Sequence, residues 1–142
     1  MDEADRIIAE LKLAPHPEGG WFRETWRAVA DDGGRSPGTA IYFLLRAGER
    51  SHWHCVDADE LWLWHAGSRI DLRVADKELR GVETFMLGGD VTRGYRPQHL
   101  VPANRWQAAM ATDGWALVSC IVVPGFDYAG FELAPRHWTP GR

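Results

Sequence analysis

The spacing of apolar positions changes once along this chain. Positions 4, 7, 8 and 11 are apolar and follow the i, i+3, i+4, i+7 pattern of an amphipathic helix. Asp2 is suited to cap that helix and Pro15 to end it. Beyond Pro15 the apolar and polar residues alternate with a period of two, which is typical of β-strands.

Short strand-like segments then follow one another, separated by turn sequences rich in Gly and Asp. Strands at roughly 8–12-residue spacing, without helices between them, predict an antiparallel sandwich or barrel. We therefore expect one domain over residues 1–142, an all-β antiparallel barrel with a short N-terminal helix packed outside. The expected strands are Trp21–Trp26, Thr39–Leu45, Glu60–His65, Ile70–Val74, Val82–Met86, His99–Val101, Leu117–Val123 and Phe131–Leu133.

Composition narrows the functional class. The chain has 142 residues and a net charge of −4, and it contains no basic run of the kind that binds nucleic acid. Its longest nearly uncharged run, residues 115–126, is shorter than the roughly 20 residues of a bilayer span. The acidic start leads into no apolar signal region. We expect a cytoplasmic protein without nucleic-acid or membrane partners, in which Cys55 and Cys120 are free thiols.

Candidate chemistry concentrates between residues 48 and 67. His52 and His54 are separated by one residue, so a regular strand would place both side chains on one face. Glu60 lies on the next expected strand and would reach the same space. Two imidazoles and a carboxylate suit a first-row divalent metal. A His-x-His pair on a strand is also common on polar surfaces, so both interpretations stay open.

The order Gly48-x3-His52-x-His54-x5-Glu60-x6-Gly67 resembles the first motif of the cupins. The spacing from the glutamate to the final glycine is that of the cupin motif, whereas the two inner spacings are shifted.

The second cupin motif is matched less completely. Gly94-x7-Pro102-Ala103-Asn104 is followed by Gln107, where Asn104 takes the place of a glycine. Asn suits that turn because it tolerates positive φ. Gln107 stands where metal-binding cupins have a histidine, and this departure weakens the metal assignment.

Over nearly its whole length the chain is similar to the uncharacterised single-domain cupin family 5. That resemblance implies a jelly-roll barrel, a dimer and a pocket for an unassigned ligand. Cys55 departs from the family, which commonly has Arg at this position. The matching blocks are residues 16–21, 23–25, 39–45, 51–54, 59–62, 101–102, 106–107, 124–126 and 131–133.

We expect the pocket to be formed by residues that share strand parity with His54 and Glu60. The expected catalytic residues are His54, Glu60 and Tyr42, and the expected ligand-binding residues are His52, Trp62, Trp64, Gln107 and Arg23.

Three functional interpretations compete, and the sequence favours the first. In it, a small polar metabolite binds in the barrel and undergoes sugar isomerase- or epimerase-like catalysis, with His54 as base and Glu60 holding its tautomer. Tyr42 or Gln107 would then stabilise oxyanion charge. In the second, His52, His54, Glu60 and Gln107 hold Zn, Ni, Mn or Fe in a metal-dependent enzyme. In the third, the protein is a non-catalytic metabolite sensor.

A homodimer is expected as well, because apolar residues occur on both faces of the strands.

Overall fold

A computed structural model describes residues 1–78 and 80–141. Its helix α1 (Glu3–Leu11) begins at Asp2, whose carboxylate accepts a hydrogen bond from the Asp5 backbone N–H at 2.8 Å. The helix ends at Lys12, which adopts a left-handed conformation with φ 57°. The predicted N-terminal helix is therefore confirmed. No helix in the described part of the chain is long and apolar enough to span a bilayer.

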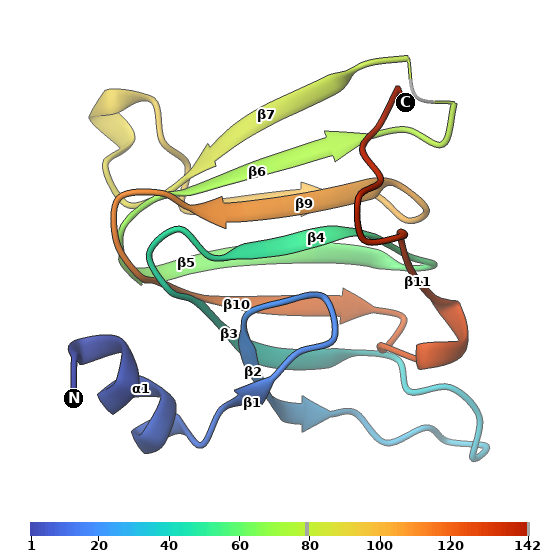
Figure 1. Ribbon diagram of the computed structural model, residues 1–142. Coiled ribbons are helices and arrows are strands. Elements are labelled where there is room, and N and C mark those ends of the chain that lie inside the picture. Colours follow the sequence, from blue (N-terminus) through green and yellow to red (C-terminus); the bar gives the residue numbers. More distant parts are fainter. Residues whose placement is uncertain (79, 142) are drawn as a thin grey trace.

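The remaining elements form two antiparallel sheets (Figure 1). The first has the order β1-β2-β3-β10-β5-β8, and the second has the order β11-β4-β9-β6-β7. Short 3₁₀ turns occupy Val91–Arg93 and Tyr128–Gly130. The strands are β1 (Ala14–Pro15), β2 (Trp21–Arg27), β3 (Thr39–Leu45), β4 (Arg50–Val56), β5 (Asp59–Gly67), β6 (Ile70–Ala75), β7 (Val82–Leu87), β8 (Gln98–Val101), β9 (Trp106–Ala111), β10 (Ala116–Val123) and β11 (Phe131–Leu133).

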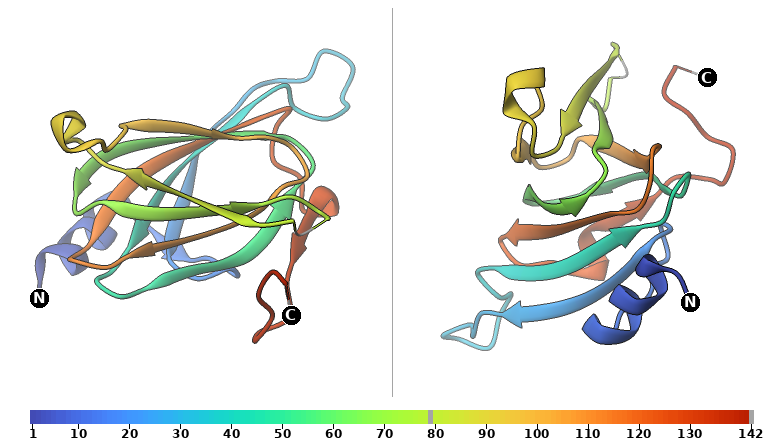
Figure 2. Two further views of the ribbon diagram at one scale, coloured as in Figure 1. Left: turned by 90° about the horizontal axis from the view of Figure 1, so that it is seen from above. Right: turned by 90° about the vertical axis from the view of Figure 1, so that its left-hand side faces the viewer.

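The two sheets face each other around one main core. Phe43, Trp62 and Val118 come from the first sheet and pack with Ile70 and Leu72 of the second. Helix α1 lies outside this pair of sheets, next to β2 (Figure 2). Over residues 1–78 and 80–141 the backbone pairing leaves two separate sheets. The antiparallel β architecture is thus confirmed, whereas closure into a jelly-roll barrel is not observed.

Three strands, the two-residue β1 and the longer β4 and β9, are absent from the expected set. Strand β9 is rich in alanine, which has a low strand propensity, so its local sequence carries a weak signal. In β4 the alternation is interrupted by a bulge: Ser51 pairs with Ala109, but His54 pairs with Gln107, which leaves one extra residue in β4. Residues three positions apart on a regular strand point to opposite faces. Because of the bulge, Ser51 and His54 both point to the interior.

Candidate functional site

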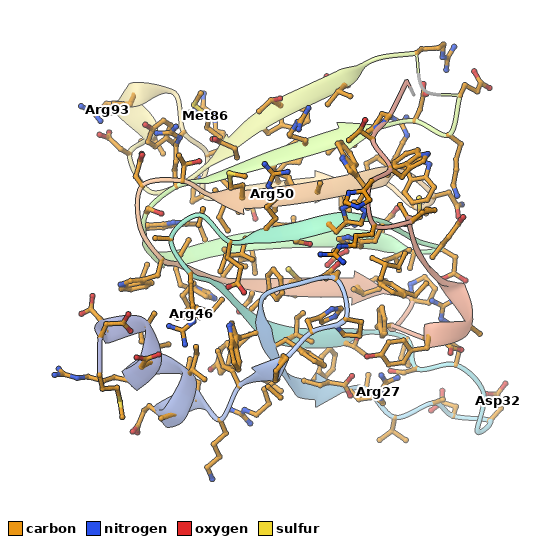
Figure 3. The ribbon with its side chains drawn as sticks, in the orientation of Figure 1. Arg27, Asp32, Arg46, Arg50, Met86 and Arg93 are labelled. Atoms are coloured by element: carbon orange, nitrogen blue, oxygen red, sulfur yellow. The ribbon has the colours of Figure 1, made fainter. Side chains whose placement is uncertain are left out.

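A cavity of about 470 Å³ lies between the two sheets, at the end of the molecule where the β2–β3 loop extends. Figure 3 labels Arg27 and Asp32 at this end and Met86 near the opposite one. Four titratable side chains form the deep end of the cavity, and two arginines stand at its mouth. The deep residues are His16, Glu18, His54 and Glu60, and the arginines are Arg27 and Arg35.

The central contact of the deep end joins His54 on β4 to Glu18 in the β1–β2 loop. The distance from His54 Nε2 to Glu18 Oε2 is 2.7 Å, and the two side chains are only 3% and 7% exposed. The other ring nitrogen, Nδ1, lies 2.7 Å from the backbone oxygen of His52. Because each nitrogen faces an oxygen that accepts hydrogen bonds, the ring is held as a doubly protonated imidazolium.

The charges of this pair support that protonation state. Burial lowers the pKa of His54, but the Glu18 carboxylate, helped by Glu60 and the His52 carbonyl, outweighs burial and raises that pKa to about 9. Burial in turn raises the pKa of Glu18, but the charge and hydrogen bond of His54, together with His16 and Ser51, outweigh burial, so the Glu18 pKa falls below its ordinary value. At neutral pH, His54 therefore acts as a fixed cation and not as a base. Glu18, not Glu60, orients its ring.

Glu60 on β5 is held in place by a chain of buried hydrogen bonds. The Gln107 amide Nε2 donates to Glu60 Oε1 at 2.8 Å, and the Trp62 indole N–H donates to Gln107 Oε1 at 2.9 Å. Burial, together with the nearby Glu18 charge, raises the pKa of Glu60, although His54 opposes this rise. The two buried acids of the site therefore differ: the pKa of Glu60 is raised, whereas that of Glu18 is lowered.

The segment His16–Gly20 places Glu18 against β4. The His52 backbone N–H donates to Glu18 O at 2.7 Å, and the Glu18 N–H donates to His16 Nδ1 at 3.1 Å. Gly19 has φ +106°, and a Cβ at this position would overlap the carbonyl oxygen of Arg50. Only glycine therefore lets the loop approach β4 closely enough for Glu18 to meet His54.

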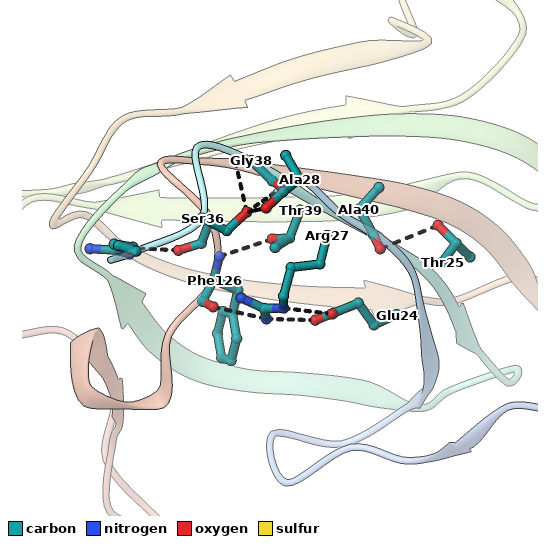
Figure 4. Close-up of polar contacts among 11 residues, drawn as sticks. Glu24, Thr25, Arg27, Ala28, Ser36, Gly38, Thr39, Ala40 and Phe126 are labelled. Atoms are coloured by element: carbon teal, nitrogen blue, oxygen red, sulfur yellow. Dashed lines mark hydrogen bonds and ion pairs between the residues drawn. The ribbon is translucent and has the colours of Figure 1, made fainter. Parts of the chain in front are cut away.

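The cavity mouth is built from two exposed ion pairs. Arg27 donates twice to Glu24, at 2.8 Å each, and once to the Phe126 carbonyl at 3.1 Å (Figure 4). Arg35 donates to the Gly125 carbonyl at 2.8 Å and to both oxygens of Asp57. Both guanidinium groups thus bind consecutive carbonyls after β10 and position the β2–β3 loop beside the opening.

Several residues expected in the pocket lie elsewhere. His52 Nε2 lies 2.8 Å from Pro135 O, because the bulge in β4 turns this side chain away from His54. Tyr42 packs beneath α1 on the outer face of the first sheet, and Arg23 stacks over its ring and donates to Leu11 O. Trp64 donates to Ser68 O and lines a separate recess.

The expected metal ligands do not form a coordination set. His52 points away, the Gln107 oxygen accepts from Trp62, and both nitrogens of His54 already face oxygens. Within residues 1–78 and 80–141, no group of three or more His, Cys, Asp or Glu side chains is placed to hold a metal ion. The described residues therefore do not fit a metal centre.

Sequence reasoning placed His54, Glu60 and Gln107 together but did not single out Glu18, Arg27 or Arg35. Two signals bear on Glu18: its position directly before two glycines, and its place in residues 16–21, which match the family. Arg27, at the end of β2, and Arg35, in the β2–β3 loop, carry no local signal, because distant carbonyls of the segment after β10 hold them at the cavity.

The arrangement of the sheets is that of a cupin. A cupin-like protein from Thermotoga maritima superposes with a TM-score of 0.56 at 15% identity, over 81% of this chain and 75% of that one. At this identity the likeness concerns the fold alone.

Sequence comparison identifies the family within that class. The family described as cupin superfamily (DUF985) matches residues 5–134. A protein from Shewanella oneidensis is 42% identical, with a TM-score of 0.87 over 94% of this chain and 85% of that one. A hypothetical protein from Leishmania major is 34% identical, with a TM-score of 0.83 over 94% of this chain and 88% of that one. The chain belongs to the DUF985 family of cupins. No curated protein matches it.

Proposed function

We propose that this protein binds a small polar metabolite in the cavity between its sheets. The observation that carries the proposal is a buried ion pair, His54–Glu18, at the end of a cavity of about 470 Å³ that opens at the β2–β3 loop. Buried charges are costly unless they are paired, and they are frequent where a protein meets a polar ligand. The volume lies in the range of small-molecule pockets.

A second candidate function, isomerase- or epimerase-like proton transfer, is favoured by the environment of Glu60. Its pKa is raised by burial and by Glu18, although His54 opposes the rise, and a raised pKa makes the Glu60 carboxylate a stronger base than a free one. In this mechanism Glu60 removes a proton from a carbon next to a carbonyl and returns it. His54 supplies fixed positive charge near the developing enolate. Glu60 thus replaces His54 in the role of base.

Proton exchange in heavy water tests the catalytic candidate. The full chain is incubated with free aldoses and amino sugars, and loss of the α-carbon proton signal is followed by NMR. We expect exchange that depends on Glu60 and disappears in Glu60→Gln. Exchange that continues unchanged in Glu60→Gln would rule out this mechanism.

Binding itself is tested by the imidazole resonances of His54. A metabolite that enters the cavity will shift these resonances, and it will leave those of His137, outside the cavity, unchanged. A sensor without catalytic activity would show the same shifts without proton exchange.

The metal-dependent alternative is tested by elemental analysis of protein purified without chelator or affinity tag, and one equivalent of Zn, Ni, Mn or Fe would favour it.

We also infer that two copies associate through the outer face of the first sheet. Cross-strand partners form an apolar row there from β2 to β8, and both ends of the row are exposed: Trp26 by 55% and Leu100 by 50%. Sedimentation should give twice the mass of the chain, and Leu100→Glu should shift it toward the monomer. A mass near 16.0 kDa at micromolar concentrations would contradict the dimer.

A further inference from the structure

The deep end contains two buried acids, Glu18 and Glu60, but one imidazolium, that of His54. His16 lies 3.6 Å from Glu18 and adds no charge at neutral pH, because burial lowers its pKa. In the part of the chain that the structure describes, Glu60 forms no ion pair with an arginine or lysine. Its neighbours are the Gln107 amide, the Cys120 thiol and the more distant His54 and Glu18. If both carboxylates are ionised, the deep end carries one negative charge in excess.

The donors and acceptors of the deep end also differ in how many hydrogen bonds they can still form with a ligand. Both ring nitrogens of His54 are occupied by Glu18 and the His52 carbonyl. The carboxylate oxygens of Glu18 and Glu60 retain lone pairs, because an ionised carboxylate accepts at about four positions. The deep end therefore offers mainly acceptors, and it is complementary to a group that donates several hydrogen bonds.

The arginines at the mouth do not reverse this balance. Arg27 is paired with Glu24 and Arg35 with Asp57, in each case through two hydrogen bonds. Asp127 also lines the mouth and adds a further negative charge. Neither end of the cavity thus presents an uncompensated cation to an anionic ligand.

The walls between the two ends are aromatic. Phe131 lies 5.7 Å from the ring of His54 and 5.7 Å from Phe126, measured between ring centroids. Phe22 packs edge-on against His16, with ring centroids 4.5 Å apart, and both rings line the same cavity. Faces of aromatic rings attract cations, and they also bury apolar groups.

We propose that the ligand of this cavity is an organic cation, with an ammonium or amidinium head beside Glu60 and an apolar body against Phe22, Phe126 and Phe131. This inference rests on the proposed binding function and names its ligand class. The head would balance the second carboxylate and donate to the oxygens that His54 leaves free. An anionic ligand would add a further negative charge to the deep end, and a neutral one would leave Glu60 without a counter-ion.

Three probes with one body and different heads test the proposal on the full chain: 2-phenylethylamine, 2-phenylethanol and 3-phenylpropionate. Binding is measured by calorimetry at pH 8 and located by the shifts of the His54 resonances. We expect the amine to bind at least about tenfold more tightly than either other probe. In Glu60→Gln this preference should disappear while 2-phenylethanol binds as before. Gln at this position still accepts from Gln107, which preserves the fold.

The exposed substitution Glu83→Gln on β7 removes the same charge outside the cavity, and it should leave all three affinities unchanged. Equal or tighter binding of the alcohol or the acid at the His54 site would overturn the cationic class and leave the proposed binding function standing. Amine preference that survives in Glu60→Gln would also overturn the proposal. If none of the probes shifts the His54 resonances at 10 mM, roughly the weakest affinity of a small ligand, both the class and the binding function are contradicted.

Discussion

The two ends of the cavity contain the same kind of interaction in different surroundings. At the deep end, His54 and Glu18 are 3% and 7% exposed, whereas Arg35 and Asp57 at the mouth are 29% and 41% exposed. Both pairs have a closest distance of 2.7 Å. Water screens the outer pair and competes for its hydrogen bonds, whereas burial shields most of the inner pair from water. Equal distances therefore imply unequal energies and different roles.

The inner pair changes the chemistry of its members, and the outer pair mainly positions a loop. The pKa of His54 is raised to about 9, so this ring keeps its second proton throughout the physiological range. The guanidinium of Arg35 is charged in any surroundings, so its pairing with Asp57 fixes the position of the side chain and does not change its charge. The difference indicates that ligand chemistry belongs to the deep end and access to the mouth.

The largest expected effect is that of removing the inner carboxylate. Glu18→Ala leaves the buried His54 with only the more distant Glu60 as a counter-ion, so we expect the free energy of unfolding to fall by about 4 kcal/mol at pH 7. Urea denaturation measures this loss. Glu18→Gln keeps the shape of the side chain, and in it the pKa of His54 should drop below its ordinary value. A titration of His54 that still centres near 9 in Glu18→Gln would show that Glu18 is not its partner.

The pH dependence of stability separates the two ends. A raised pKa in the folded state means that the folded protein binds more protons, so the contribution of His54 is complete below about pH 6.5 and is lost as pH rises through about 9. We expect a loss of about 3 kcal/mol across this window. Asp57 acts in the opposite direction: its pKa is lowered mainly by Arg35, so its contribution is lost as pH falls below about 3.8.

Urea denaturation at a series of pH values measures both trends. His54→Gln should flatten the alkaline slope. It also removes the cation that lowers the pKa of Glu18, so in this variant the acid limb should keep the contribution of Asp57 and lose that of Glu18. An unchanged alkaline slope in His54→Gln would assign the effect to another group, such as Cys120.

Two glycines with positive φ provide a matched pair of substitutions. Gly19→Ala should destabilise the protein by about 3 kcal/mol, because the new methyl group overlaps the Arg50 carbonyl in addition to the cost of its left-handed backbone. Gly33, in the β2–β3 loop, has φ +73°, and a methyl group added there would meet no other atom within 4 Å. Gly33→Ala should cost about 1 kcal/mol. Equal melting temperatures of the two variants would contradict the close approach of the Glu18 loop to β4.

The smallest effect is expected at the mouth. Arg35→Ala removes an exposed pair and should change the free energy of unfolding by less than about 1 kcal/mol. It should also leave the titration of His54 unchanged, since Asp57 and Arg35 do not contact the deep end. A loss as large as that of Glu18→Ala would mean that the mouth is part of the same buried network.

Much of the architecture was predictable from local patterns. The helix at residues 3–11 follows from its apolar spacing and the Asp2 cap, and most strands follow from alternation with a period of two. His54, Glu60 and Gln107 were also expected together, and the structure brings them together. Local sequence determines these features because propensity, capping and alternation act over a few residues.

Tertiary structure decided the rest of the site. The bulge in β4 separates His52 from His54, and it exists only because β4 pairs with β9. Glu18 becomes the partner of His54 because the glycine-containing loop folds back onto β4, a contact between segments more than thirty residues apart. Tyr42 shares the strand of cavity residue Ile41 but points to the opposite face, beneath α1. Pairing between distant strands and loop closure depend on the whole chain, so no local pattern determines them.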